Sequence, residues 1–343
     1  MMSLKLTICI PSFNRGHAAL RQVLHTLPLI EPDWEILVLD NCSSSNLEGY
    51  GEIELLVKSD SRVRYIRHQE NLGFAGNILS CFTFSNAPCI QINSDEDFSN
   101  PSVVRDAVAT LTEFPKVGLI RGSIGAIAGM RPRNSTRYPD QFLEAGRSAL
   151  ADFSLSTNYL SGIIYNKDLL VSLGILQKLK NGVESNDNMI AVYPHMYLDI
   201  IISSLCKVIT SSELVCFEGE EASYTPDIQS TAAAFPYTFS GRLEQFIGFR
   251  DAFRKVCGPD ELNDLSLLIH LYLRLVQKYC SLFRIDGFLY TARGMGLGPL
   301  QDSLRHFFIS AAEIDEFASV RNMVHEMVQE RFQLCLPTKA ELS

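Results

Sequence analysis

The sequence predicts an α/β protein with a mostly parallel sheet and an additional helical region toward its C-terminus. In the first 120 residues, short apolar runs alternate with segments whose apolar residues recur at helical spacing. From about residue 239 onward, the patterns are those of amphipathic helices, and no strand pattern is recognisable. We therefore expect an α/β domain over residues 1–235 and a helical region over residues 236–343.

Five buried strands are expected in the N-terminal part, at residues 4–10, 34–39, 63–66, 89–92 and 117–120. The helices expected between them are 16–27, 73–84 and 100–114, and the last begins with Asn100 as N-cap and Pro101 at the first helical position. This alternation is typical of a Rossmann-like sheet flanked by helices. Because ligands of such sheets bind beyond the carboxyl ends of the strands, the residues that follow each strand are the first candidates for a site.

The remaining elements are expected to be less regular. Between residues 141 and 217 we expect a helix at 141–153, a strand at 160–165, a short helix at 168–173, a helix over 186–205 with a boundary at Pro194, and a strand at 214–217. Three or four amphipathic helices should follow, at about 240–256, 260–283, 300–311 and 313–334. The apolar part of the second of these indicates the core of a bundle, with a homodimer face or a peripheral membrane contact as alternatives.

Residues 122–138 interrupt the pattern and predict a mobile loop after the fifth strand. This segment holds Arg131, Arg133 and Arg137 among Gly, Pro, Asn and Ser residues. Its position on the ligand side of the sheet favours a lid or a contact for an anionic acceptor, such as a lipid-linked diphosphate. A solvated loop without a ligand is the alternative.

Composition narrows the classes of function. The 343 residues are 46% hydrophobic and 20% charged, which is ordinary globular composition. The net charge of −9 argues against non-specific nucleic-acid binding, which needs cations to neutralise phosphates. Nine cysteines without a CxxC pair, together with no recognisable signal peptide or long apolar run, predict a reduced protein in the cytoplasm, with the inner face of the cytoplasmic membrane as an alternative location.

Polar residues follow the first two strands directly. After the first strand, Pro11, Ser12, Asn14 and Arg15 offer a hydroxyl, an amide and a cation just before a helix begins, which suits a nucleotide base and phosphate. Asp40 follows the second strand and can accept hydrogen bonds from a base or a ribose. The alternatives are an ordinary strand–helix turn and a local Asx turn.

Two further segments follow the third and fourth strands. Asn71 and Asn77 flank small residues that allow a helix N-terminus to approach a ligand closely. The fourth strand leads into Asp95, Glu96 and Asp97, three adjacent carboxylates that repel one another and that a divalent cation would stabilise. A simple tight turn and a solvated acidic turn are the respective alternatives.

Taken in this order, the segments resemble the N-terminal region of glycosyltransferase family two, whose members have the GT-A fold. The similarity is clear over residues 4–120 and looser over 154–217. It implies inverting, metal-dependent transfer of a sugar from a nucleotide-sugar donor to a hydroxyl of a glycan or lipid-linked oligosaccharide, in the assembly of a surface polysaccharide such as lipopolysaccharide. Within the domain, residues 1–120 would bind the nucleotide sugar and 121–235 the acceptor.

The resemblance also implies roles for individual residues, position by position. Pro11, Ser12, Asn14 and Arg15 would line the nucleotide pocket, with Asp40 on the base and Asn71 and Asn77 nearby. The acidic triplet matches the DxD motif of the family, so Asp95 would approach the ribose and the metal. Asp97 would hold Mn²⁺ or Mg²⁺ on the diphosphate, where a cation stabilises the charge that the leaving group gains.

One departure from the family concerns the general base. Members usually carry a Glu-Asp pair at the start of a helix, whereas this sequence has Pro194-His195 at the corresponding place. A histidine can serve as a base because its pKa lies near working pH. Asp187 and Glu184 are the reserve candidates, and a structural histidine is the alternative. The stretch Tyr-Pro-His-Met-Tyr-Leu from Tyr193 is similar to one in abequosyltransferase-like O-antigen enzymes.

Two other functions compete with glycosyl transfer. A sugar-nucleotidyltransferase would need a Gly-rich basic loop after the first strand, and residues 10–15 contain no glycine and one cation. A non-catalytic partner subunit would keep the fold without the chemistry, and the intact Asp95 and Asp97 argue against it.

Overall fold

The computed structural model describes residues 4–126, 136–156, 159–185, 187–219, 239–257 and 266–275, and the single positions 263, 264, 322, 323 and 326. By its internal contacts the chain forms two compact units. The first comprises Met1–Ala145 and Thr157–Ser223, and the second comprises Gly146–Ser156 and Tyr224–Ser343. The first unit therefore contains all the residues that the sequence predicts for donor binding and catalysis.

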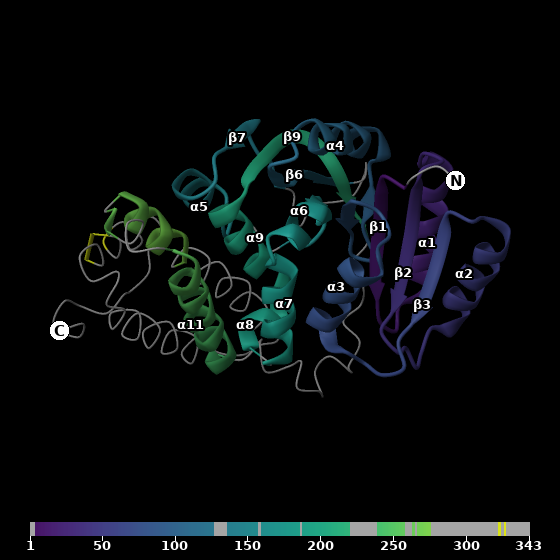
Figure 1. Ribbon diagram of the computed structural model, residues 1–343. Coiled ribbons are helices and arrows are strands. Elements are labelled where there is room, and N and C mark those ends of the chain that lie inside the picture. Colours follow the sequence, from purple (N-terminus) through teal and green to yellow (C-terminus); the bar gives the residue numbers. More distant parts are fainter. Residues whose placement is uncertain are drawn as a thin grey trace. The chain divides into compact units, whose positions relative to one another are not determined.

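The first unit is organised around a nine-stranded sheet with the order β3-β2-β1-β4-β8-β6-β9-β5, in which β7 also pairs with β9 (Figure 1). The strands are β1 (Leu6–Ser12), β2 (Trp34–Asp40), β3 (Val63–Arg67), β4 (Cys89–Ile92), β5 (Phe98–Ser99), β6 (Val117–Ala126), β7 (Gln141–Leu143), β8 (Ile163–Asn166) and β9 (Lys207–Glu218). The pairs β1–β2, β2–β3 and β1–β4 are parallel, whereas β8 runs antiparallel to β4 and β6. The predicted α/β fold class is confirmed.

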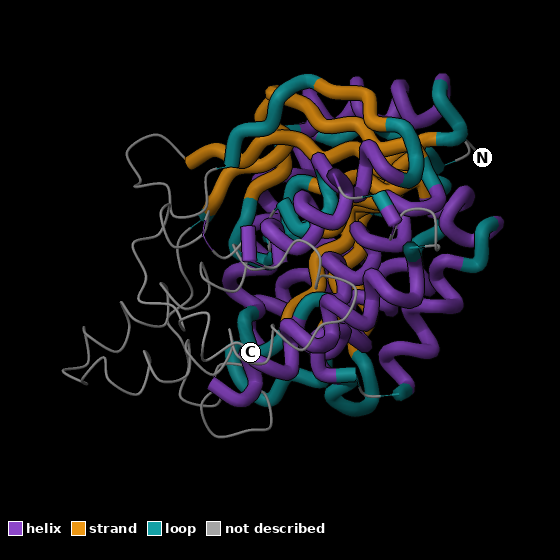
Figure 2. Tube along the Cα trace, turned by 90° about the vertical axis from the view of Figure 1, so that its left-hand side faces the viewer, coloured by secondary structure: helices purple, strands orange, loops and turns teal. Residues whose placement is uncertain are grey.

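Helices cover both faces of this sheet (Figure 2). They are α1 (Gly16–Thr26), α2 (Leu47–Ser59), α3 (Gly73–Phe84), α4 (Pro101–Glu113), α6 (Lys167–Ser172), α7 (Ile175–Glu184), α8 (Asn188–Val192) and α9 (Pro194–Leu205). In β1, Ile8 and Ile10 belong to a buried cluster that includes residues of α1, α2 and α4. Because strand side chains alternate, Cys9 points to the opposite face, where its thiol donates to the carbonyl oxygen of Cys81 in α3.

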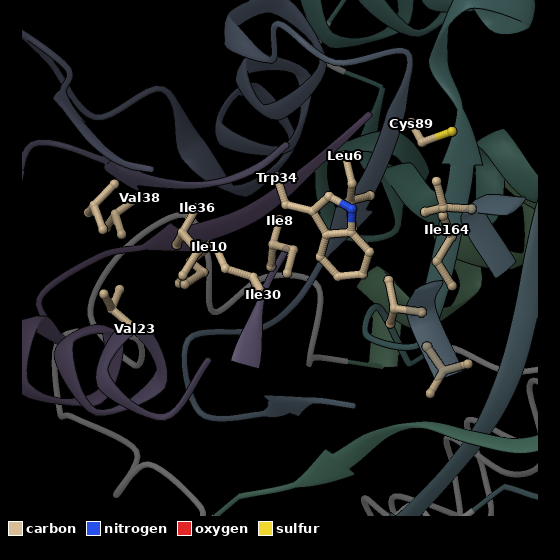
Figure 3. Packing of buried hydrophobic residues seen from close by; sticks show 14 of the residues in the cluster. Leu6, Ile8, Ile10, Val23, Ile30, Trp34, Ile36, Val38, Cys89 and Ile164 are labelled. Carbon is tan, nitrogen blue, oxygen red and sulfur yellow. The ribbon is translucent and has the colours of Figure 1, made fainter. Parts of the chain in front are cut away.

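Figure 3 shows this cluster around Trp34, with branched side chains of β1 and β2 beside it. Trp34 is only 2% exposed, and Val23 contributes to the cluster from α1. Burial of such large apolar side chains is the main stabilising contribution to the sheet. The cluster thus gives the carboxyl ends of β1 and β2 a rigid support.

The strand order places a switch point between β1 and β4. The chain builds β2 and β3 on one side of β1 and then crosses to add β4 on the other side. In open α/β sheets, ligands bind in the crevice outside the carboxyl ends of the strands at such a point. At this point β1 ends at Ser12 and leads into Phe13 to Arg15, and β4 leads into Asp95 to Asp97.

An unusually close contact between α1 and α2 fixes the second helix against the first strand–helix turn. A Cβ atom on Gly49 would lie 2.2 Å from the carbonyl carbon of Gly16 and 2.3 Å from its oxygen. Only glycines permit this approach. The sequence analysis did not predict α2, because Gly49 and Gly51 weaken its helical pattern.

The prediction of a helix over 141–153 is wrong. Residues Gln141–Leu143 form β7, which pairs antiparallel with β9, and a shorter helix α5 covers Arg147–Asp152. Gly146, with φ of +85°, separates the two elements. Pairing with β9 therefore overrides the helical pattern of the short segment that contains Phe142 and Leu143.

Several boundaries also differ from the predictions. β1 continues through Pro11 to Ser12, because its pairing with β4 ends at Cys9 and the missing N–H of proline removes no bond there. Residues 122–126 belong to β6 rather than to the predicted loop, and Arg131 and Arg133 lie outside the described residues. β9 begins at Lys207, well before the predicted strand. Its register with β6 shifts after Ser211, so its apolar residues do not alternate regularly along the sequence. The helix α7 was not predicted.

The second unit is helical where it is described. Its helix α11 (Phe239–Val256) confirms the expected helix at 240–256, and residues 266–275 are helical as expected within 260–283. Arg274 donates from Nη2 to the carbonyl oxygen of Asp152 at 2.7 Å, which ties α5 to this helix. Nearly all of the expected helices at 300–311 and 313–334 lies outside the described residues.

Two findings bear on the remaining expectations. No helix within the described residues has both the length and the apolarity needed to cross a membrane. The described cysteines are free thiols, as expected, and all but Cys42 are buried.

The glycine contact between α1 and α2 gives a prediction with a built-in control. Gly49→Ala should destabilise the protein by about 1–3 kcal/mol, because backbone atoms of Gly16 cannot move aside without separating the helices. Gly51→Ala on the same helix meets no atom within 4 Å and should be neutral or stabilising by up to about 1 kcal/mol. Urea unfolding of both variants is the measurement, and equal stability of the two would contradict the assigned packing.

Candidate functional site at the carboxyl ends of β1 and β4

The residues that follow β1 and β4 contact each other directly. The hydroxyl of Ser12 donates to Oδ2 of Asp95 at 2.7 Å. Arg15 reaches two carboxylates, with Nη1 at 2.9 Å from Oδ1 of Asp95 and Nη2 at 2.6 Å from Oε2 of Glu96. The candidate residues that follow these two strands are therefore in direct contact.

The acidic triplet divides into two parts with different surroundings. Asp95 and Glu96 lie in the turn after β4 and share Arg15, whose side chain is 28% exposed. Asp97 is fully buried, because the next two residues form β5 and pair with β9. Its Oδ1 accepts from the hydroxyl of Tyr159 and its Oδ2 from the hydroxyl of Ser161, both at 2.6 Å.

Burial dominates the electrostatics of both aspartates. Desolvation raises the pKa of Asp95 to about 6, although Arg15 and the hydrogen bond from Ser12 act in the opposite direction. Desolvation likewise raises the pKa of Asp97 to about 6, against the hydrogen bonds from Ser161 and Tyr159. Buried carboxyl groups with raised pKa values are typical of functional sites.

The metal that the DxD resemblance implies does not fit this arrangement at Asp97. Carboxylate oxygens are the right kind of ligand for Mn²⁺ or Mg²⁺. Both oxygens of Asp97, however, are engaged by hydroxyls, and both oxygens of Asp95 are engaged by Ser12 and Arg15. Among the described residues, no group of three or more His, Cys, Asp or Glu side chains is arranged to hold a metal ion.

Asn14 and Asp40 hold the neighbouring loops together. Oδ1 of Asn14 accepts from the backbone N–H groups of Ser44 and Ser45, at 2.8 and 3.0 Å. Asp40 is fully buried, and its carboxylate accepts from the N–H of Ser43 at 2.8 Å and from the hydroxyl of Tyr65 at 2.9 Å. Both residues that were expected to contact a nucleotide therefore also shape the loop that follows β2.

The two asparagines near α3 differ in exposure. Asn71 is exposed, and its Oδ1 accepts from Nδ2 of Asn41 at 2.8 Å. Asn77 is buried, donates to the carbonyl oxygen of Leu39 and lies 3.2 Å from Nε2 of His68. Asn71 is thus linked to the loop after β2, and Asn77 to the end of that strand.

The three candidate bases occupy different environments. His195 lies in the first turn of α9, is 2% exposed and packs edge-on against Tyr193. Asp187 caps α8, where its carboxylate accepts from two backbone N–H groups of the first turn. Glu184 is exposed near the end of α7 and lies 3.7 Å from Lys180. Only His195 stands at the start of the long helix that the resemblance indicated.

Sequence reasoning missed three residues that surround the acidic triplet. Tyr159 and Ser161 contact Asp97, and Tyr50 contacts Ser12 at 2.7 Å. None belongs to a recognisable motif, and each comes from a segment distant in sequence. The only signal for Tyr50 was its place beside Gly49 in an otherwise helical pattern.

Comparison with known proteins identifies the kind of domain. Residues 7–172 match the family model of Glycosyl transferase family 2, and no curated protein matches the sequence. This match indicates a glycosyltransferase domain in the first half of the chain, in agreement with the resemblance in the strand-end motifs.

Two solved structures are among those to which this chain is similar at low identity. Residues 1–349 of TarS from S. aureus, in complex with UDP-GlcNAc, are 14% identical at a TM-score of 0.47, and the alignment covers 96% of this chain and 93% of that one. The mannosyltransferase PcManGT from Pyrobaculum calidifontis, in complex with GDP-Man and Mn²⁺, is 13% identical at a TM-score of 0.49, with coverages of 97% and 87%.

The raised pKa of Asp97 predicts a pH-dependent change in stability. The folded protein binds this proton more tightly than the unfolded chain does. Ionisation of Asp97 therefore lowers the free energy of unfolding, by little below pH 3.8 and by the largest amount above about pH 6. Relative to wild type, Asp97→Asn should therefore gain about 1–1.5 kcal/mol between pH 5 and pH 8.

Urea unfolding at the two pH values measures this gain. Asp106→Asn on the exposed surface of α4 is the control and should show no comparable gain. A stability difference between wild type and Asp97→Asn that does not change with pH would show that burial does not control the carboxyl of Asp97.

Proposed function

We propose that the protein transfers a sugar from a nucleotide-sugar donor to a hydroxyl of a glycan or lipid-linked glycan acceptor. The observation that carries this proposal is the direct contact of Ser12 and Arg15 with Asp95 at the switch point between β1 and β4. This is the place where open α/β sheets bind their ligands, and it lies in the segment that matches the glycosyl transferase model.

The residues at these two strand ends suit the ribose and the diphosphate of a nucleotide diphosphate. Each oxygen of Asp95 has a second lone pair besides the one that meets Ser12 or Arg15, so this carboxylate can also accept hydrogen bonds from ribose hydroxyls. Arg15 follows β1, is partly exposed and carries the charge that a diphosphate requires. When the bond between the sugar and the diphosphate breaks, the leaving group gains negative charge, and a guanidinium held at this place stabilises it.

The acceptor half of the reaction requires a base. The acceptor oxygen forms the new bond to the anomeric carbon while the bond to the diphosphate breaks, and the proton of the hydroxyl passes to the base. We retain His195 for this role, with Asp187 and Glu184 as alternatives. Transfer with inversion rests on the resemblance to glycosyltransferase family two. An acceptor of the O-antigen type rests on the resemblance of the segment around His195 to such enzymes.

A divalent cation, Mn²⁺ or Mg²⁺, belongs to the proposal through the DxD resemblance alone. The steps described above are written without a cation, and the oxygens of Asp97 already accept hydrogen bonds from two hydroxyls. Binding and transfer should therefore be measured with each metal and with EDTA. The cytoplasmic location, the membrane contact and a homodimer through the C-terminal helices likewise remain predictions from sequence.

Donor binding tests the central part of the proposal. UDP-, GDP-, CDP- and dTDP-sugars should be compared by thermal shift and by donor hydrolysis, and one nucleotide class should stabilise the protein. Arg15→Met should weaken that binding by about 10- to 100-fold, as expected for loss of a charge-assisted contact. Arg105→Met is the control. It removes an exposed arginine of α4 that pairs with Glu31, and it should leave nucleotide binding unchanged. Absence of binding by every class would reject the function.

The base is tested by a substitution that keeps polarity but cannot accept the proton. His195→Asn should lower kcat by about 10²- to 10⁴-fold with donor affinity nearly intact. Asp187→Asn and Glu184→Gln provide the comparison, and circular dichroism establishes that each variant is folded. A folded His195→Asn enzyme with near-normal kcat would transfer the role to whichever of the other two variants is impaired.

A further inference from the structure

The hydroxyl of Tyr50 joins the turn after β1 to the loop after β2. Tyr50 lies on α2 and is 2% exposed. Its oxygen accepts from the backbone N–H of Arg15 at 3.2 Å and from the hydroxyl of Ser43 at 3.1 Å, and it lies 2.7 Å from the hydroxyl of Ser12. Ser12 in turn contacts Asp95. Tyr50 is therefore one hydroxyl removed from the acidic turn.

These hydroxyls form a series of hydrogen bonds that begins at a backbone N–H group and ends at a carboxylate. The two end groups determine the direction of every hydrogen bond between them. The backbone N–H of Asn14 can only donate, and it donates to Ser43 at 2.7 Å. At the other end, an ionised Asp95 can only accept, so the single proton of Ser12 is used there. Tyr50 must then donate to Ser12. The protons point one way, from Asn14 through Ser43, Tyr50 and Ser12 to Asp95.

Because all these hydrogen bonds point the same way, they affect the last bond of the series, from Ser12 to the carboxylate of Asp95. Each hydroxyl that accepts a bond becomes a better donor in the next one, which strengthens the bond to the carboxylate. Burial raises the pKa of Tyr50 and so keeps the phenol protonated and able to donate. The chain thus holds one oxygen of Asp95 while Arg15 holds the other.

The fold fixes Tyr50 in this position from two sides. The close contact of Gly16 and Gly49 brings α2 against the first turn, one residue before Tyr50. Its ring stacks on that of Tyr65, with centroids 6.0 Å apart, and the hydroxyl of Tyr65 donates to Asp40. The paired tyrosines therefore connect the polar groups at the ends of β1 and β2.

We propose that Tyr50 is a positioning residue of the donor site, which acts through Ser12 to hold the carboxylate of Asp95 in the orientation that meets the nucleotide. This inference rests on the proposed function. It assigns Tyr50 no contact with the reacting atoms. Loss of the hydroxyl leaves Ser12 free to rotate, and one oxygen of Asp95 loses its fixed donor.

Tyr50→Phe tests the proposal, because it keeps the ring and its stacking on Tyr65. Binding of UDP, GDP, CDP and dTDP in the presence of Mn²⁺ is measured by calorimetry. The nucleotide that binds wild type should bind Tyr50→Phe roughly 3- to 30-fold more weakly. Tyr165→Phe is the control, since Tyr165 is fully buried and its hydroxyl has no hydrogen-bond partner among the described residues. Equal weakening in both variants would overturn the proposal.

A double-mutant cycle separates positioning from a general structural role. Ser12→Ala cuts the link between Tyr50 and Asp95, so adding Tyr50→Phe to it should weaken nucleotide binding no further. If Tyr50 supported the fold independently, the two losses would multiply. Wild-type affinity in Tyr50→Phe, or multiplying losses in the double variant, would overturn the assignment.

The same cycle, measured by urea unfolding without nucleotide, distinguishes this inference from the proposed function. If wild type binds none of the four nucleotides, the proposed function fails, and so does the positioning role in donor binding. The hydrogen-bond chain is then supported if the double variant loses less stability than the sum of the single variants. Additive losses in unfolding would show that Tyr50 and Ser12 are not coupled at all.

Discussion

Three adjacent carboxylates at the end of a buried strand impose the main constraint on this structure. Charged groups of one sign are costly to bury together, and the raised pKa values of Asp95 and Asp97 reflect that cost. The protein responds with two kinds of partner. Arg15 neutralises the exposed side of the cluster, and hydroxyl groups from β1 and from the segment before β8 satisfy the buried side. The arrangement of the residues around the acidic turn follows from these contacts.

These partners come from segments that the sheet alone brings together. Ser12 ends β1, Tyr159 and Ser161 precede β8, and β4 lies between these two strands. The acidic turn is therefore held from both neighbouring strands at once. A site preorganised in this way loses stability to the buried charges but needs little rearrangement when a ligand arrives. In the function proposed for this protein, the same buried carboxylates that lower its stability would also contact the donor.

The sequence contained enough to predict which strand ends come together, but it did not show how the surroundings of the individual carboxylates differ. Strand ends are visible because buried strands are apolar, and polar residues then follow: Ser12 ends β1, Asp40 ends β2, and Asp95 comes shortly after β4. The difference between Asp95 and Asp97 is invisible, since it depends on the pairing of the two residues after Asp97 with β9, far along the chain. Tyr159 and Ser161 were missed for the same reason. Local patterns report which face a residue takes, not which distant segment covers it.

The helix α2 shows the converse, in which a feature that obscures the sequence pattern is what positions the site. Gly49 lowers helix propensity and concealed α2, yet it permits the contact with Gly16 that brings Tyr50 to the first strand end. A residue with a side chain at this position would strengthen the isolated helix and move it away from β1. The requirement for close packing therefore outweighs local propensity, and the hydrogen bonds around Ser12 depend on a glycine that makes none of them.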